Sequence, residues 1–167
     1  MTTTYYYVTA FDNARTGWTK YGSSPYLSVI DYPTNYIAIS DVTDVETGDY
    51  DFADSGAENS EIIDSVTIEI YRYDKLNAPG DVYVYVWNGS AWIYVGGFEI
   101  SNAVWSWKSL DVSAVLNSWA KIDSARLYLR GTADELCLTR IDCARIKVVS
   151  HAAAVFASKR LLVGVGV

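Results

Sequence analysis

The acidic residues offer the first candidate chemistry, because carboxylate oxygens are the ligands that Ca²⁺ prefers. Residues 41–64 carry nine Asp and Glu side chains and no Lys or Arg. Within this segment the run GDYDFADSG supplies three candidate Ca²⁺ ligands, Asp49, Asp51 and Asp54. The run departs from an EF-hand loop, because its Gly stands at the wrong offset from the acids. We favour a solvated acidic loop as the alternative, since such charge protects neighbouring sheet edges.

Side chains that could carry catalysis are sparse. His151 is the only histidine, and we place it in a C-terminal tail outside the folded domain. Cys137 and Cys143 could face each other across a hairpin, but we favour two buried, reduced thiols. No CxxC, GxSxG, Walker or Rossmann motif is present. The sequence therefore predicts a protein that is not an enzyme and has no cofactor other than the candidate Ca²⁺ ion.

A dense run of aromatic rings offers a contact chemistry instead. The stretch DVYVYVWNGSAWIYVGG, residues 81–97, alternates valines with large rings. If the valines face the core, the rings share the opposite face. This candidate binding surface consists of Tyr83, Tyr85, Trp87, Trp92 and Tyr94. The rings could be covered by the N-terminal YYY strand or the C-terminal tail, form a subunit interface, or stack on a sugar.

The centre of this stretch, Asn88-Gly89, predicts a β-hairpin closed by a type I′ turn. With Ser90 the same residues match an N-glycosylation sequon, but the turn explains them without a modification. Similar alternation of apolar and polar residues recurs in SVTIEIYRY (65–73), SARLYLR (124–130) and ARIKVV (144–149). Alternation of this kind predicts half-buried antiparallel strands throughout the chain.

One segment, SLDVSAVLNSWAKID (109–123), departs from this alternation. We expect a strand to end near Asp111, and a short helix to cross one end of the sheets before the next strand. Asp111 or Ser113 would cap this helix. Its inward-facing residues would be Val115, Leu116 and Trp119.

The order of these elements, including WSWKSLDVSAVLNSW between the aromatic hairpin and IDSARLYLR, resembles a known group. Residues 60–149 resemble the second half of jelly-roll sandwiches of the carbohydrate-binding-module and galactose-binding-like type. The resemblance implies an all-β antiparallel β-sandwich with one short helical crossover. Similar modules occur in virion surface, tail and decoration proteins of phages and archaeal viruses. Their ligand residues vary between families, so the resemblance implies none here.

Charge and hydropathy limit the partners. Outside residues 41–64 the chain has 11 acidic and 13 basic side chains, so the acidic segment accounts for the net charge of −7. Such a surface repels phosphates, and we expect no nucleic-acid partner. The sequence contains no run of 18 apolar residues, so we expect no membrane-spanning helix. The opening MTTTYYYVTAFDNA lacks the basic and apolar regions of a signal peptide, as expected for a virion protein assembled inside the cell.

The last 18 residues differ in composition from the rest, and we divide the chain into a sandwich domain (1–149) and an assembly tail (150–167). The tail ends RLLVGVGV, and we expect it to add a strand to its own sheet or to a neighbour's. Its candidate contact residues are Leu161, Leu162, Val163 and Val165. The sequence predicts a structural subunit of a virion or extracellular filament. We expect it in the virion or at the extracellular surface, in contact with copies of itself or with other virion proteins. The alternative is a carbohydrate-binding or adhesion module that uses the aromatic hairpin.

Overall fold

The computed structural model describes residues 1–12, 18–23, 27–40, 45–55, 61–76, 80–98, 101–132 and 138–153. Antiparallel strands dominate it, which confirms the all-β prediction. The elements, in chain order, are β1 (Thr2–Asp12), β2 (Thr19–Tyr21), β3 (Tyr36–Ser40), β4 (Val45–Glu46), β5 (Asp49–Phe52), β6 (Glu61–Asp74), β7 (Asp81–Trp87), β8 (Trp92–Gly97), β9 (Ser106–Asp111), α1 (Trp119–Asp123), β10 (Arg126–Thr132) and β11 (Leu138–Ala152). The acidic segment thus contains the short strands β4 and β5 and the start of β6.

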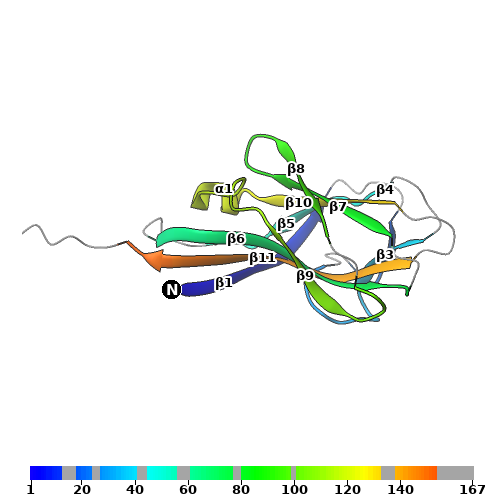
Figure 1. Ribbon diagram of the computed structural model, residues 1–167. Helices are drawn as coiled ribbons and strands as arrows, with labels where there is room; N and C mark the ends of the chain where they lie inside the picture. The colour runs from blue at the N-terminus through cyan, green and yellow to red at the C-terminus, as the bar shows by residue number, and fades with distance from the viewer. Residues whose placement is uncertain are drawn as a thin grey trace, which may run out of the picture.

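Two sheets face each other in a β-sandwich-like arrangement (Figure 1). In the first sheet β6 lies between β9 and β11, and the other edge of β11 pairs with β3 and with β1. In the second sheet the order is β8, β7, β10, β5 and β1, with β4 beside β10. Strand β1 belongs to both sheets: Thr2–Tyr7 pair with β11, and residues 8–12 pair with β5.

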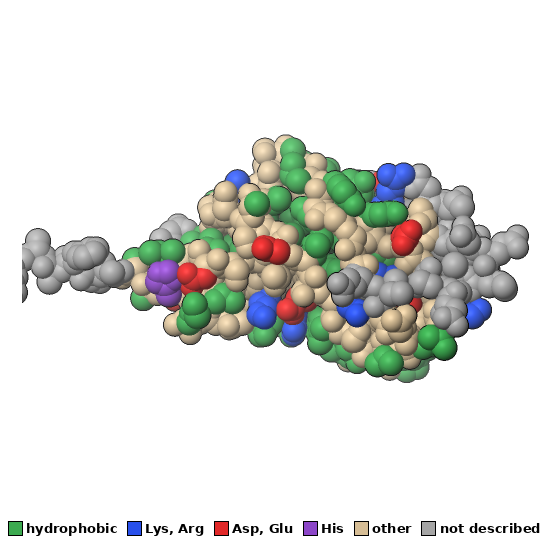
Figure 2. All heavy atoms as spheres, in the orientation of Figure 1, with side chains coloured by type: hydrophobic (Ala, Val, Ile, Leu, Met, Phe, Trp, Pro, Cys, Tyr) green, Lys and Arg blue, Asp and Glu red, His purple; other side chains and the backbone are tan. Residues whose placement is uncertain are grey.

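The core lies between the two sheets and follows the predicted alternation. In β7 every second residue is almost completely buried and its neighbours point outward, and parts of β6, β10 and β11 follow the same alternation. The buried set includes Val66, Ile68, Ile70, Val82, Val84, Val86, Leu127, Leu129, Ile146 and Val148. Other apolar side chains reach the surface, and Figure 2 shows several of them over β7 and β8. The interior therefore does not account for all the aromatic residues of the chain.

The hairpin between β7 and β8 forms as predicted, but its turn is not type I′. Trp87 pairs with Trp92, which leaves a four-residue loop, and only Gly89 within it has a positive φ, +92°. A type I′ turn needs positive φ at both central residues. Asn88 instead keeps negative φ and uses its side-chain oxygen as an acceptor for the Ser90 N–H, the Ser90 hydroxyl and the Ala91 N–H. This side chain replaces the expected backbone geometry.

The predicted helical crossover is present, but it begins later than expected. Ser118 caps α1, accepting a hydrogen bond from the Lys121 N–H, so Asp111 and Ser113 are not its caps. Asp111 accepts from the backbone and hydroxyl of Ser113 and so closes a turn directly after β9. The inward-facing residues are as predicted: Leu116 and Trp119 are buried and Val115 packs against the core.

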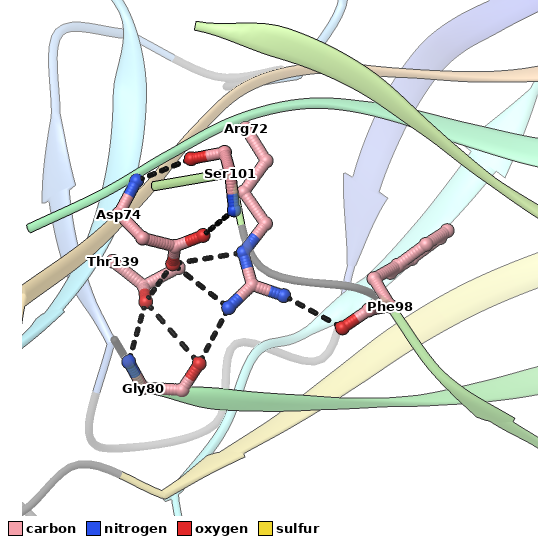
Figure 3. A network of polar contacts seen from close by, with 6 residues as sticks. All are labelled: Arg72, Asp74, Gly80, Phe98, Ser101 and Thr139. Atoms are coloured by element: carbon pink, nitrogen blue, oxygen red, sulfur yellow. Dashed lines mark hydrogen bonds and ion pairs between the residues drawn. The ribbon is translucent and has the colours of Figure 1, made fainter. Parts of the chain in front are cut away.

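A buried polar network fixes the other end of the sandwich (Figure 3). Arg72 and Asp74, both fully buried, form an ion pair with 2.8 Å between Nη2 and Oδ1. The Arg72 guanidinium also donates to the carbonyls of Gly80 and Phe98, at the ends of two loops. The Asp74 carboxylate accepts from the Thr139 hydroxyl and the Ser101 N–H. Each charged group thereby obtains several partners, as burial of ions requires.

Strand β11 continues beyond the predicted domain boundary, which places His151 in the sandwich and not in a tail. Ser150 is buried and pairs with both β1 and β6, so the sheet extends over the predicted junction. The His151 Nδ1 lies 2.8 Å from the Asp64 carboxylate on β6. Residues 154–167 lie outside the described part of the chain, and with them the predicted contact residues Leu161, Leu162, Val163 and Val165.

Cys143 is completely buried and its thiol is free, as favoured from the sequence, whereas Cys137 lies outside the described residues. Burial is the main cause that raises the pKa of the Cys143 thiol to about 12, because a thiolate loses its hydration there. In a Cys137→Ser variant we therefore expect the folded protein to react with Ellman's reagent at pH 8 roughly a thousandfold more slowly than the urea-unfolded protein. Equal rates in the two states would contradict this placement.

Candidate functional site

The five predicted rings lie together on the outer face of the second sheet. Because the valines of β7 point into the core, Tyr83, Tyr85 and Trp87 point outward. The hairpin brings Trp92 and Tyr94 of β8 beside them. A sixth ring, Tyr128 of β10, joins this group, which we call the aromatic cluster. The sequence does contain the signal for Tyr128, because it alternates with the buried Leu127 and Leu129.

Within the aromatic cluster the rings pack on one another. Tyr85 stacks on Tyr128 with 4.5 Å between centroids and 5° between planes. Tyr94 leans against Tyr85 at 5.4 Å, and Trp92 meets Tyr128 edge-on at 4.8 Å. Trp87 contacts Trp92 at 5.7 Å. These offset and edge-to-face geometries are the favourable ones for aromatic pairs. The cluster is therefore a preorganised surface whose rings already support one another.

A β-bulge in the hairpin sets the position of Tyr94. The register shifts between Val84, which pairs with Gly96, and Tyr85, which pairs with Tyr94, so Val95 is the additional residue. Gly96 has a φ of +129°, a backbone angle that residues other than glycine rarely adopt. The bulge keeps Tyr94 within contact of both Tyr83 and Tyr85.

A shallow hollow of about 510 Å³ lies at one side of the cluster, lined by Tyr83, Tyr85, Tyr94, Arg130 and Thr132. The Tyr83 hydroxyl donates to the Asp81 carboxylate at 3.4 Å. The negative charge of Asp81 is the main cause that raises the pKa of Tyr83, so its phenol remains a neutral hydrogen-bond donor. The hollow thus combines ring surfaces with polar groups at its rim, as binding sites do.

The aromatic cluster remains accessible on the described protein. Tyr94 is 55% exposed, and all the other rings except Tyr128 are partly exposed. The N-terminal YYY strand, one of the segments expected to cover them, lies elsewhere, because β1 pairs with β11 and β5. The other expected cover, the C-terminal tail, is outside the described residues. The N-terminal strand therefore does not cover the cluster and leaves it open to a partner.

A second aromatic surface, which sequence reasoning missed, covers the outer face of the first sheet. The Arg145 guanidinium lies 3.8 Å from the ring centroid of Trp107 and 4.1 Å from that of Tyr5. It also forms an ion pair with Glu69 at 2.7 Å and donates to the Tyr7 hydroxyl. We call these five residues the arginine–aromatic surface. The run TTTYYYVTA contained its signal, because alternation places Tyr5 and Tyr7 on one face.

The three predicted Ca²⁺ ligands lie in different surroundings. Asp49 is buried, Asp54 is exposed, and Asp51 forms an ion pair with Arg126 at 2.9 Å. Burial is the main cause that raises the pKa of Asp51; Arg126 opposes it, and nearby Asp12 and Asp49 add to it. Among the described residues no three His, Cys, Asp or Glu side chains gather as metal ligands would. Residues 41–44, which carry two further acids of the segment, lie outside the description.

Neither a protein-family model nor a curated protein sequence matches this chain. In the portion described, no helix has the length and apolar character needed to cross a bilayer. The features of the described structure that bear on function are therefore the two aromatic surfaces and the hollow beside the aromatic cluster.

Proposed function

We propose that this protein is a non-enzymatic structural subunit of a virion or extracellular filament, built on a jelly-roll sandwich of the carbohydrate-binding-module type. It assembles with copies of itself or with other proteins of the particle through its outer aromatic faces. The observation that carries this proposal is the presence of accessible ring surfaces on both sheets: the aromatic cluster on one and the arginine–aromatic surface on the other. Tyr, Trp and Arg are enriched at protein–protein interfaces.

The packing within the aromatic cluster supports a protein partner over a sugar. A sugar platform needs a free ring face, whereas the closest faces of Tyr85 and Tyr128 are stacked on each other. The stacked faces of these two rings are therefore closed to a sugar, whereas their edges and hydroxyls suit a broad contact of many small interactions. Because its rings are already held in place, little side-chain entropy is lost on binding.

The position of the two surfaces supports a polymer. The sheets pack face to face, so their outer faces point in opposite directions. If one face binds a different surface on the next copy, each copy contacts two neighbours, and such head-to-tail contacts generate open filaments or closed rings. A subunit of a repeating shell or fibre requires contacts of this kind.

The test is the mass of the purified chain, measured by light scattering over a range of concentrations. We expect an oligomer or polymer, and we expect Tyr94→Glu to reduce its mass, because a charge at this exposed position would be buried on assembly. Leu76→Glu is the matched control, since Leu76 is equally exposed (58%) but belongs to neither aromatic surface. A wild-type monomer at all concentrations, or equal effects of both variants, would refute the assembly proposal.

A carbohydrate-binding or adhesion module is the second candidate, and the hollow beside Tyr83 favours it. Arg130 and Thr132 can supply polar contacts there, next to the exposed ring of Tyr94. This alternative expects a monomer with a glycan-array signal that Tyr94→Ala abolishes. The absence of any glycan signal from the intact protein would exclude it.

A further inference from the structure

Asp142 is a buried carboxylate with no counterpart on the neighbouring strand. In β11 the pairing with β6 shifts between Ile141, opposite Arg72, and Cys143, opposite Tyr71, so Asp142 is the bulged residue. A bulge turns one side chain out of the regular alternation. Asp142 is nevertheless 0% exposed, under the segment that includes Asp31. The bulge therefore presents this carboxylate to a covered site above the first sheet.

The bonding of this carboxylate is incomplete. Its Oδ1 accepts from the Asp31 N–H at 3.4 Å, whereas its Oδ2 accepts no hydrogen bond from any residue described. No Arg or Lys in the described ranges forms an ion pair with Asp142. Burial is the main cause that raises its pKa, and the backbone N–H groups of Tyr32 and Asp31 only partly oppose it. A buried, unpaired oxygen of this kind is costly, so it points to a missing donor.

The space beside Asp142 is a pocket with aromatic walls. It has a volume of about 220 Å³ and is lined by Ile30, Asp31, Tyr32, Tyr71, Trp105 and Asp142. The ring of Trp105 lies 5.0 Å from that of Tyr32 and 5.4 Å from that of Tyr71. The Asp31 carboxylate is engaged by the backbone and side-chain nitrogens of Asn35. Asp142 is therefore the anion of this pocket that keeps an unsatisfied oxygen. Because that oxygen is itself buried, an occupant reaches it only when the covering segment that includes Asp31 moves aside.

We propose that this pocket binds a primary alkylammonium group, whose N–H donates to the Asp142 Oδ2 while the rings of Tyr32, Tyr71 and Trp105 form the walls around it. Aromatic faces attract cations, and a buried carboxylate both attracts and hydrogen-bonds them. The same face of the sheet already holds two guanidinium groups over rings: Arg145 over Trp107, and Arg140 5.5 Å from the Tyr32 centroid. Arg140 donates to the Tyr32 hydroxyl and not to Asp142.

The free atom on Asp142 selects among cations. A quaternary ammonium has no N–H to donate, so it would leave Oδ2 unsatisfied. A guanidinium prefers two parallel bonds to both carboxylate oxygens, and Oδ1 already accepts from Asp31. A neutral hydroxyl can donate to Oδ2 but does not compensate its charge. A primary ammonium, either on a small free amine or on a lysine side chain of a protein, meets both requirements.

The test titrates the whole chain with n-butylammonium chloride at constant ionic strength, following the tryptophan indole N–H resonances by NMR. The Trp105 resonance is assigned by its loss in Trp105→Phe. We expect saturable shifts of this resonance with n-butylammonium, and none with butan-1-ol or tetramethylammonium. Nα-acetyl-lysine amide binding as tightly as n-butylammonium would assign the site to lysine side chains, and weaker binding would assign it to free amines.

Two variants locate the site. Asp142→Asn keeps the shape but removes the charge, and we expect it to weaken binding by about tenfold or more. Tyr94→Ala, on the other sheet, should leave binding unchanged, so this test is independent of the assembly proposal. Should Asp142→Asn fail to fold, Trp105→Leu is expected to show the same loss of n-butylammonium binding, measured by competition against a fluorescent primary amine. The proposal is overturned if n-butylammonium does not saturate the signal, if butan-1-ol or galactose binds equally well, or if the variants retain binding.

Discussion

Replacing Arg72 with methionine is expected to lower the free energy of unfolding by about 3–5 kcal/mol in urea denaturation. The reason is that the substitution leaves the Asp74 carboxylate buried without its counter-ion. It also removes the donors to the Gly80 and Phe98 carbonyls, at the ends of two loops. Buried acceptors that lose their partners cost the full free energy of desolvation.

The matched control is Arg126→Met. Arg126 also forms an ion pair with an aspartate, Asp51, but its side chain is 43% exposed, and water replaces a lost partner there. Such exposed pairs contribute about 0–1 kcal/mol. If Arg72→Met cost no more than Arg126→Met, the network in Figure 3 would not hold the loops as we describe.

Trp119→Ala is expected to destabilise the fold by about 3–5 kcal/mol, because it removes a large ring from the core and leaves a cavity. Trp119 is 6% exposed, and its indole N–H donates to the Glu61 carbonyl at 2.8 Å. It thereby joins α1 to the first residue of β6. Thermal and urea denaturation measure the loss.

Two controls separate the contributions at Trp119. Trp119→Phe keeps most of the ring volume and should retain most of the stability, losing mainly the hydrogen bond. Trp87→Ala removes an equally large ring from the partly exposed aromatic cluster, so we expect a smaller loss. Equal losses for Trp87→Ala and Trp119→Ala would contradict the assignment of Trp119 to the core.

Alternation in the sequence was sufficient to predict the long strands of the hairpin and of residues 65–73, 124–130 and 144–149, and the face on which the aromatic cluster lies. It succeeds because side chains of a strand alternate strictly between core and surface, so Val84 buried implies Tyr83 and Tyr85 outside. The turn and the helix cap were predicted less well. At both positions a polar side chain, Asn88 or Ser118, provides the hydrogen bond, and several nearby residues could have done so on sequence grounds.

The pocket at Asp142 could not be predicted from alternation. Ile141 and Ala144 both face the core although they are three residues apart, and only the bulge between them makes this possible. The walls come from Tyr32, Tyr71 and Trp105, which are distant in the chain. Their meeting depends on strand pairing and on the path of a loop, and neither follows from local sequence.

Strand β1 couples the unfolding of the two sheets. Its first half is hydrogen-bonded to the first sheet and its second half to the second, with an irregularity between Val8 and Ala10 where it passes from one to the other. The sheets are therefore linked by continuous backbone as well as by the apolar interior. Neither can melt separately without losing half of this strand's pairing, so the sandwich should unfold as one cooperative unit. If the chain assembles as we propose, a subunit under tension would then resist force as a whole.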